Sequence, residues 1–139
     1  MSTTSRKRPL FPAGRDTSTG PYTPALCVDP FVFVSGQGPL DPETHQVTGS
    51  TLEEQAELTL TNVKTLLAEA GCTMDDCVKV TVHLADMRHY DRFNRVYERF
   101  FRKPFPTRTL VQSGLLDILV EIDAIAIKGA GGKGRETET

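Results

Sequence analysis

The chain of 139 residues suits a single domain with one hydrophobic core, and its 38% hydrophobic and 24% charged residues are ordinary for a globular protein. Its formal net charge of -2 gives no electrostatic reason to expect nucleic acid or an anionic membrane as a partner. No apolar run approaches the roughly 20 residues of a bilayer-spanning helix, and the N-terminus lacks the apolar stretch of a secretory signal, so we expect neither.

The cysteines indicate a reducing compartment. Cys27, Cys72 and Cys77 are odd in number and follow no disulfide-framework spacing, so we expect reduced thiols in a cytoplasmic protein. Neither these cysteines nor the histidines have the spacing of metal ligands, so we expect no metal site.

Composition divides the chain into a domain and two flanking segments. Residues 1–19 are rich in Ser, Thr, Arg, Pro and Gly and predict a flexible arm. Its basic run Arg6–Arg8 is either a solvated charge run or a phosphate or targeting patch. The Gly-rich residues 129–139 predict a flexible tail, which leaves residues 20–128 as the ordered domain.

The first half of the domain predicts two strands and a helix. Short strands are expected at Pro24–Val28 and Phe31–Ser35, and the second is apolar at consecutive positions, which predicts cover on both of its faces. Ser50 followed by Glu53 predicts a capping box that opens the first helix, and Gly71 supplies its end. Apolar side chains recur along this helix at helical spacing, which predicts one buried face.

The second half begins with the clearest strand pattern in the sequence. Cys77–Leu84 alternates so that its even-numbered residues, all Val or Leu, share one face, and its odd-numbered residues, from Cys77 to His83, share the other. A second helix is expected at about His89–Arg102, with a stripe of aromatic residues along it. Pro104 and Pro106 end this helix.

The last two predicted strands each carry one charge that is unusual in a core. We expect strands at Thr107–Ser113 and Ile118–Ile127, joined by a tight connection at residues 113–117. Arg108 lies at the start of the first strand, and Glu121 lies within the apolar run of the second. Because buried strands rarely accept unpaired charges, the two residues are either an ion pair at the rim of an edge strand or a functional pair.

The predicted order is β-β-α-β-α-β-β, an α+β fold in which two helices cover one face of a mixed sheet. The strands at Phe31–Ser35 and Ile118–Ile127 are apolar on both faces. The second face therefore needs cover that this chain does not supply, which predicts a homo-oligomer.

Four segments resemble the RidA/YjgF family of reactive imine deaminases in sequence, order and spacing. They are Gly20-Pro21-Tyr22, then Phe31–Pro42 (FVFVSGQGPLDP), then Asn94-x-x-Tyr97-x-x-Phe100-Phe101 ahead of Pro104–Arg108 (PFPTR), and then Val120–Ala126 (VEIDAIA). The resemblance spans about residues 20–128.

The resemblance implies a chorismate mutase-like fold assembled as a homotrimer, with the sheets facing inward, the helices outside and a cleft between each pair of neighbouring subunits. Active members of the family hydrolyse 2-imino acids, or their enamine tautomers, to 2-keto acids and ammonia. They use no metal or cofactor, so the expected partners are a small-molecule imino acid and further copies of the same chain.

The resemblance also implies the site residues. Arg108 is the catalytic arginine, because a guanidinium fork binds a carboxylate at two points and so orients the adjacent imine carbon. Glu121 is the glutamate that orients or deprotonates the attacking water. Backbone N–H groups at Gly36 and Leu110 are expected to complete the carboxylate site. Tyr22 either closes the cleft or is a packed surface aromatic.

Two further candidates have supporting roles, and the sequence departs from the family at two places. Ser35 is expected to shape the turn at Gly36, and Asn94 to join a helix to a loop by a hydrogen bond. Many members have a cysteine where this chain has Leu110, and its Ser113–Asp117 connection is shorter than in common members.

Three functions fit these features. The first is an imine deaminase, the second a non-catalytic ligand-binding or protein-protecting trimer of the same fold, and the third a ribonuclease. Arg108 together with Glu121 favours the first, because a purely structural trimer needs no arginine in its cleft. The acidic charge balance counts against the third.

Overall fold

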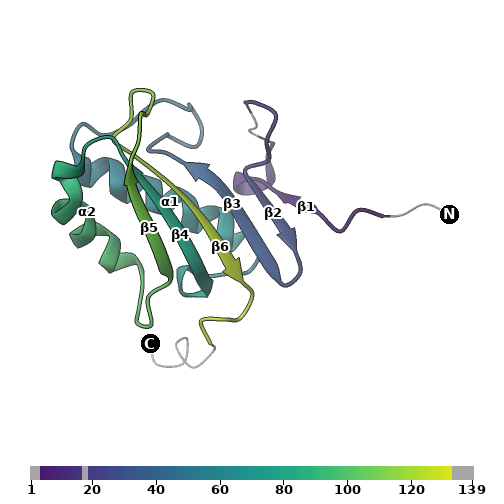
Figure 1. The fold of residues 1–139 in the computed structure, drawn as a ribbon. Coiled ribbons are helices and arrows are strands. Elements are labelled where there is room, and N and C mark those ends of the chain that lie inside the picture. The colour runs from purple at the N-terminus through teal and green to yellow at the C-terminus, as the bar shows by residue number, and fades with distance from the viewer. Residues whose placement is uncertain (1–3, 17–18, 133–139) are drawn as a thin grey trace.

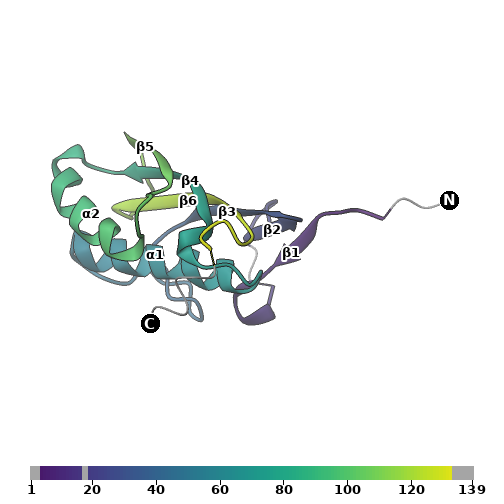
Figure 2. The ribbon, with the colours of Figure 1, turned by 90° about the horizontal axis from the view of Figure 1, so that it is seen from below.

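The structure, a computed structural model, describes residues 4–16 and 19–132. Both α-helices lie on the same face of one mixed sheet (Figure 2), as the sequence predicts for an α+β fold. The strands and α-helices of the described residues are β1 (Arg8–Leu10), β2 (Ala25–Val28), β3 (Phe31–Gln37), α1 (Leu52–Ala68), β4 (Cys77–Leu84), α2 (Tyr90–Tyr97), β5 (Thr107–Gln112) and β6 (Val120–Ile127).

The sheet has the order β1-β2-β3-β6-β4-β5 (Figure 1), in which only β4 and β5 pair in parallel. The last two strands are therefore not neighbours, although a short connection joins them. Because α2 carries the chain back over the sheet, β5 must run parallel to β4 on its outer side. The connection then crosses the end of β4, where Ser113 N donates to Leu84 O (2.9 Å) and Ala85 N donates to Leu119 O (3.0 Å).

Both flanking segments take part in the fold, which corrects the prediction of a flexible arm and tail. Arg8–Leu10 pairs antiparallel with β2, and Leu10 is only 5% exposed. At the other end, Gly131 N donates to the buried carboxylate of Asp76 at 2.7 Å. A three-residue strand that contains a proline has little local signal, so the free edge of β2 decides its pairing. The remaining parts of these predictions, residues 1–3, 17–18 and 133–139, lie outside the described residues.

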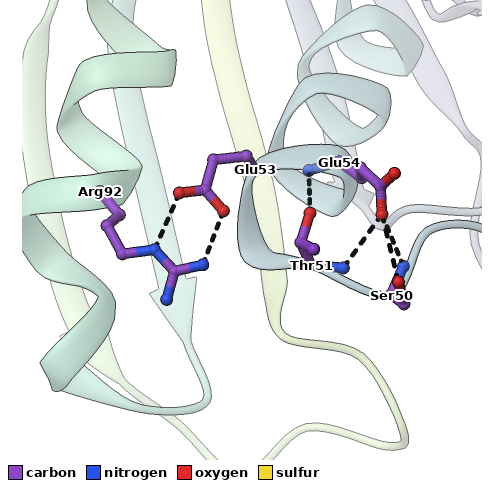
Figure 3. A network of polar contacts seen from close by, with 5 residues as sticks. All are labelled: Ser50, Thr51, Glu53, Glu54 and Arg92. Atoms are coloured by element: carbon purple, nitrogen blue, oxygen red, sulfur yellow. Dashed lines mark hydrogen bonds and ion pairs between the residues drawn. The ribbon is translucent and has the colours of Figure 1, made fainter.

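The capping box of α1 lies one residue later than predicted (Figure 3). Thr51 Oγ1 accepts from Glu54 N, and Glu54 Oε1 accepts from Thr51 N, each at 3.1 Å. Ser50 and Thr51 are both followed by Glu at the third position, so the motif does not separate them. The shift leaves Glu53 free to accept from Arg92 of α2 at 2.6 and 2.8 Å, which ties the two helices together.

The core lies between the helices and one sheet face. The predicted apolar face of α1 is buried, and it packs with the even-numbered residues Val80, Val82 and Leu84 of β4. Cys77 is also buried, although the alternation predicts it on the opposite face. The register between β4 and β6 shifts between Cys77 and Lys79, because a bulge there turns the start of β4 over.

The second helix is shorter than predicted. Tyr90–Tyr97 is α-helical, and single 3₁₀ turns flank it on both sides, Met87–His89 before and Glu98–Phe100 after. Its aromatic stripe is a row of contacting rings, with centroids 5.6 Å apart from Phe93 to Tyr97 and 4.5 Å apart from Tyr97 to Phe101. This row lies next to β5, since Arg108 Cζ is 4.8 Å from the ring centroid of Tyr97.

The opposite face of the sheet has no cover from the described residues. Phe31 and Phe33 of β3 are 42% and 40% exposed there, and their rings are stacked with centroids 6.2 Å apart. The half-buried Ile125 and Ile127 of β6 share this face, because they pair with Phe33 and Phe31. We refer to it as the open face.

Candidate functional site

Arg108 lies on the helix-covered side of the sheet. It is the parallel-strand partner of Val80, which is fully buried beneath the helices. Partners in adjacent strands point to the same side, so the guanidinium extends beneath α2 rather than onto the open face. Its strand, β5, is the edge of the sheet, so the outer backbone groups of β5 are not paired within the sheet.

The guanidinium is held by α2. Arg108 Nη1 donates to Asn94 Oδ1 at 2.9 Å, so Asn94 joins α2 to strand β5 rather than to a loop. Arg108 Cζ lies 4.8 Å from the ring centroid of Tyr97 and 6.0 Å from those of Tyr90 and Phe93. Cation–π contact and a hydrogen bond to a neutral amide position the charge without neutralising it.

The surroundings leave Arg108 available for an anion. Among the described residues it forms no ion pair, so the rim ion pair with Glu121 is not present within this chain. Burial raises the pKa of Tyr97 to about 12, against the opposing effect of the Arg108 charge, so Tyr97 is neutral. A partly buried cation whose contacts are all neutral is suited to bind a carboxylate.

Leu110 lies two residues beyond Arg108 on the same side of β5. It is the partner of the buried Val82 and packs, half-buried, against the hydrophobic core. A leucine there makes the side of the site next to Arg108 apolar.

Glu121 lies on the open face. It pairs with His83 across β6 and β4, and its neighbours Val120 and Ile122 point into the core. A Cβ placed on Gly36 would lie only 2.5 Å from Glu121 Oε2. Gly36 therefore leaves space that the Glu121 carboxylate fills, and this close approach is a reason for a glycine at this position.

Two further predicted site residues, Ser35 and Tyr22, lie in the segments before Gly36. Ser35 Oγ donates to Thr23 O at 2.6 Å, so Ser35 joins β3 to the preceding loop. Tyr22 in that loop is 54% exposed, and its hydroxyl lies 3.0 Å from Thr19 Oγ1. Tyr22 and Gly36 both line a cavity of about 290 Å³ between this loop and α1.

The structure thus separates the predicted site residues into two groups. We call Arg108, Asn94 and Leu110 the arginine group, and Glu121, Gly36, Ser35 and Tyr22 the glutamate group. Val80, the partner of Arg108, and His83, the partner of Glu121, lie three residues apart in β4. That separation is roughly 10 Å along the strand, and the two side chains point to opposite sides of the sheet.

Sequence reasoning missed the rings that surround Arg108. Tyr90, Phe93 and Tyr97 recur at spacings of three and four, which predicts an apolar helix stripe. The stripe is partly core, since Phe93 and Tyr97 are buried, yet all of these rings also lie within 6.0 Å of the Arg108 guanidinium carbon. A polar Asn94 inside the stripe is the signal that marks its second role.

These features define a class, a small α+β protein with two helices on one sheet face, an uncovered second face and an available arginine at the sheet edge. Residues 14–128 match the family model described as Endoribonuclease L-PSP. The chain therefore belongs to this family, the YjgF/RidA family, which confirms the resemblance seen in the sequence.

Relatives and solved structures agree with this assignment. The chain is 39% identical over 124 residues to a RutC family protein of Pyrococcus abyssi, covering 88% of this chain and 98% of that protein. It is 37% identical over 131 residues to 2-iminobutanoate/2-iminopropanoate deaminase of Bos taurus, covering 93% of this chain and 95% of that protein. The crystal structure of Escherichia coli TdcF with bound serine is similar with a TM-score of 0.80 and 32% identity, covering 88% of this chain and 99% of that chain.

Within the described residues, no helix combines the length and the apolar character that crossing a membrane requires.

All of the cysteines are free and buried, and burial raises the pKa of the Cys77 thiol to about 12. Because the thiolate is the nucleophilic form, Cys77 is a poor nucleophile.

Proposed function

We propose that this protein is a cytoplasmic, homotrimeric hydrolase that converts 2-imino acids, or their enamine tautomers, to 2-keto acids and ammonia without a metal or cofactor. Relatives named as 2-iminobutanoate/2-iminopropanoate deaminases, 34–37% identical to this chain, support the reaction class. The observation that carries the proposal is the separation of Arg108 from Glu121.

The register supports an active site formed by two copies. Arg108 and Glu121 lie on opposite sides of one sheet, so a small substrate cannot contact both within one chain. A second copy that covers the open face brings the arginine group of one subunit against the glutamate group of its neighbour. The exposed rings of Phe31 and Phe33 supply apolar surface for such an interface.

In such a cleft, Arg108 binds the substrate carboxylate. The guanidinium donates to both carboxylate oxygens, which fixes the adjacent planar C=N group. Backbone N–H groups at the free edge of β5, next to Leu110, and at Gly36 of the neighbour complete the carboxylate site. Asn94 and the surrounding rings keep the fork in one orientation, so the substrate arrives at a positioned group.

Glu121 acts on water. Its carboxylate orients a water molecule toward the imine carbon and accepts a proton as the C–O bond forms. The π electrons of the C=N bond move to nitrogen, and the resulting carbinolamine loses ammonia to give the keto acid. A protonated imine is already electrophilic, so this addition needs no metal. Tyr22 closes the cleft and donates its hydroxyl.

An oxidase-coupled assay tests the activity. An amino-acid oxidase generates 2-iminobutanoate or 2-iminopropanoate, and semicarbazide traps whatever imine survives. We expect the protein to suppress trapping at catalytic concentration. Suppression that is only stoichiometric with the protein, without turnover, supports the non-catalytic binding trimer instead. An RNA-cleavage arm on the same preparation tests the ribonuclease alternative.

Subunit mixing tests the two-copy site. Arg108→Ala and Glu121→Gln are each expected to lack turnover alone. When the two variants are dissociated, mixed and reassembled, about a quarter of the clefts regain an intact Arg108 and an intact Glu121 from different subunits. Recovery of activity supports the shared cleft, and its absence in reassembled mixed trimers contradicts it.

A further inference from the structure

A histidine and a serine lie beside Glu121 on the open face. His83 of β4 is the antiparallel partner of Glu121 in β6, and both side chains leave the sheet on the same side. His83 Nδ1 lies 2.7 Å from Ser113 Oγ. Ser113 is itself anchored, since its N–H donates to Leu84 O at 2.9 Å.

The geometry holds the imidazole in a defined position. One ring nitrogen is engaged by the Ser113 hydroxyl, and Nε2 has no hydrogen-bond partner among the described residues, so it is available to exchange a proton with a ligand. Side chains of antiparallel partners have Cβ atoms roughly 4.5–5.5 Å apart. The Glu121 side chain leans from β6 toward Gly36 of β3, whereas His83 lies on β4. The Glu121 carboxylate and the His83 imidazole therefore flank β6 on its two sides.

We propose that His83 is a further catalytic residue, the group that protonates the departing nitrogen, and that Ser113 is its positioning residue. This inference rests on the proposed deaminase function, in which Glu121 acts as a base but no acid for the leaving group has been assigned. Imine hydrolysis needs both, because ammonia is a far better leaving group than the amide anion.

The proton and electron balance is complete with these two side chains. Glu121 accepts a proton from water as the water oxygen bonds to the carbon of the protonated imine, and the C=N π pair moves to nitrogen. Protonated His83 then donates a proton to that nitrogen, and the C–N bond breaks with its electron pair leaving on ammonia. As the carbonyl forms, the hydroxyl proton of the carbinolamine passes to His83, and the proton on Glu121 returns to solvent.

The charged side chains nearest His83 lie on its own strand and on β6. The titratable side chains on the same face of its own strand and of β6 are Lys79, Glu121 and Asp123. Lys79 Nζ donates to Thr109 Oγ1 at 3.0 Å, toward β5 and away from β6. Glu121 and Asp123 thus place two carboxylates on the strand that neighbours His83. The β5 residues on this face carry no titratable side chain and are Thr107, Thr109 and Val111.

Kinetics of His83→Gln test the proposal. General acid catalysis typically contributes a hundredfold or more, so we expect kcat to fall about a hundredfold with KM little changed. The decline of kcat at high pH, which reports loss of the donor proton, is expected to disappear in this variant. Wild-type kcat and an unchanged pH profile in an assembled His83→Gln protein would overturn the proposal.

Ser113 offers a matched pair of variants. Ser113→Ala removes the hydroxyl, and loss of one hydrogen bond predicts a kcat lower by roughly fivefold. Ser113→Thr retains a hydroxyl and is expected to keep most of the activity. Equal loss in both variants would indicate a packing role for Ser113 and would overturn its assignment.

A binding measurement separates this proposal from the proposed function. In wild-type protein with ¹⁵N-labelled histidine, titration with the product 2-oxobutanoate is expected to shift the His83 ring signals saturably. Failure of the oxidase-coupled assay in wild type, with this shift present, rejects the deaminase reaction but leaves His83 at a ligand site. Turnover in wild type without any shift at His83 rejects the role of His83 and leaves the proposed deaminase function standing.

Discussion

Replacing Arg108 by lysine separates a carboxylate-binding arginine from a structural one. Lysine keeps the positive charge but loses the planar fork, so it cannot donate to Asn94 and to two carboxylate oxygens in the same arrangement. Among the described residues, no carboxylate forms an ion pair with Arg108. The arginine and lysine forms are therefore expected to differ in activity when a substrate carboxylate binds.

The magnitude follows from the interactions that each substitution removes. A hydrogen bond to a charged group contributes about 1.5–3 kcal/mol, so loss of one arm of the fork lowers kcat/KM roughly tenfold to a hundredfold. Cation–π contact with the surrounding rings contributes up to about 2 kcal/mol when desolvated. Arg108→Ala is therefore expected to lose more activity than Arg108→Lys and to lower Tm by a few degrees, with assembly retained.

The assay measures imine turnover, Tm and oligomer mass on the same preparations. Arg95→Lys is the matched control, because Arg95 is exposed on the same helix that holds Arg108 and is expected to tolerate the change. Wild-type turnover in an assembled Arg108→Ala protein would refute the reasoning. So would activity that is lost only in proportion to the unfolded fraction.

Three other changes test separate parts of the structure. Gly36→Ala places a Cβ 2.5 Å from Glu121 Oε2, so turnover should fall several-fold through displacement of the carboxylate while Tm changes little. The hydrogen bonds from Arg92 lower the pKa of Glu53 from 4.5 to about 2, so the stability difference between wild type and Glu53→Gln should be present above about pH 4.5 and vanish as pH falls toward 2, measured as Tm against pH. Phe33→Asp places a charge on the open face and should dissociate the proposed trimer, and a trimer mass for this variant by light scattering would contradict the proposed interface.

Local patterns in the sequence determine most of the elements. The alternation of Cys77–Leu84, the apolar face of Leu52–Ala68 and the paired prolines after the second helix each act through near neighbours in the chain, so period and turn chemistry are enough to predict them. Arg108 and Glu121 also stand out in the sequence, because charges in apolar strands are rare. Both residues lie within the family motifs as well.

Only the tertiary structure decides where those residues lie. The insertion of β4 between β5 and β6, the bulge at Cys77 and the pairing of Arg8–Leu10 with β2 depend on hydrogen bonds between segments far apart in the chain. That topology turns Arg108 under the rings of α2 and Glu121 onto the open face beside His83. A strand's own sequence specifies which residues alternate, whereas its neighbours and the packed helices specify which side each residue faces, and the physical separation of the two catalytic candidates follows from the latter.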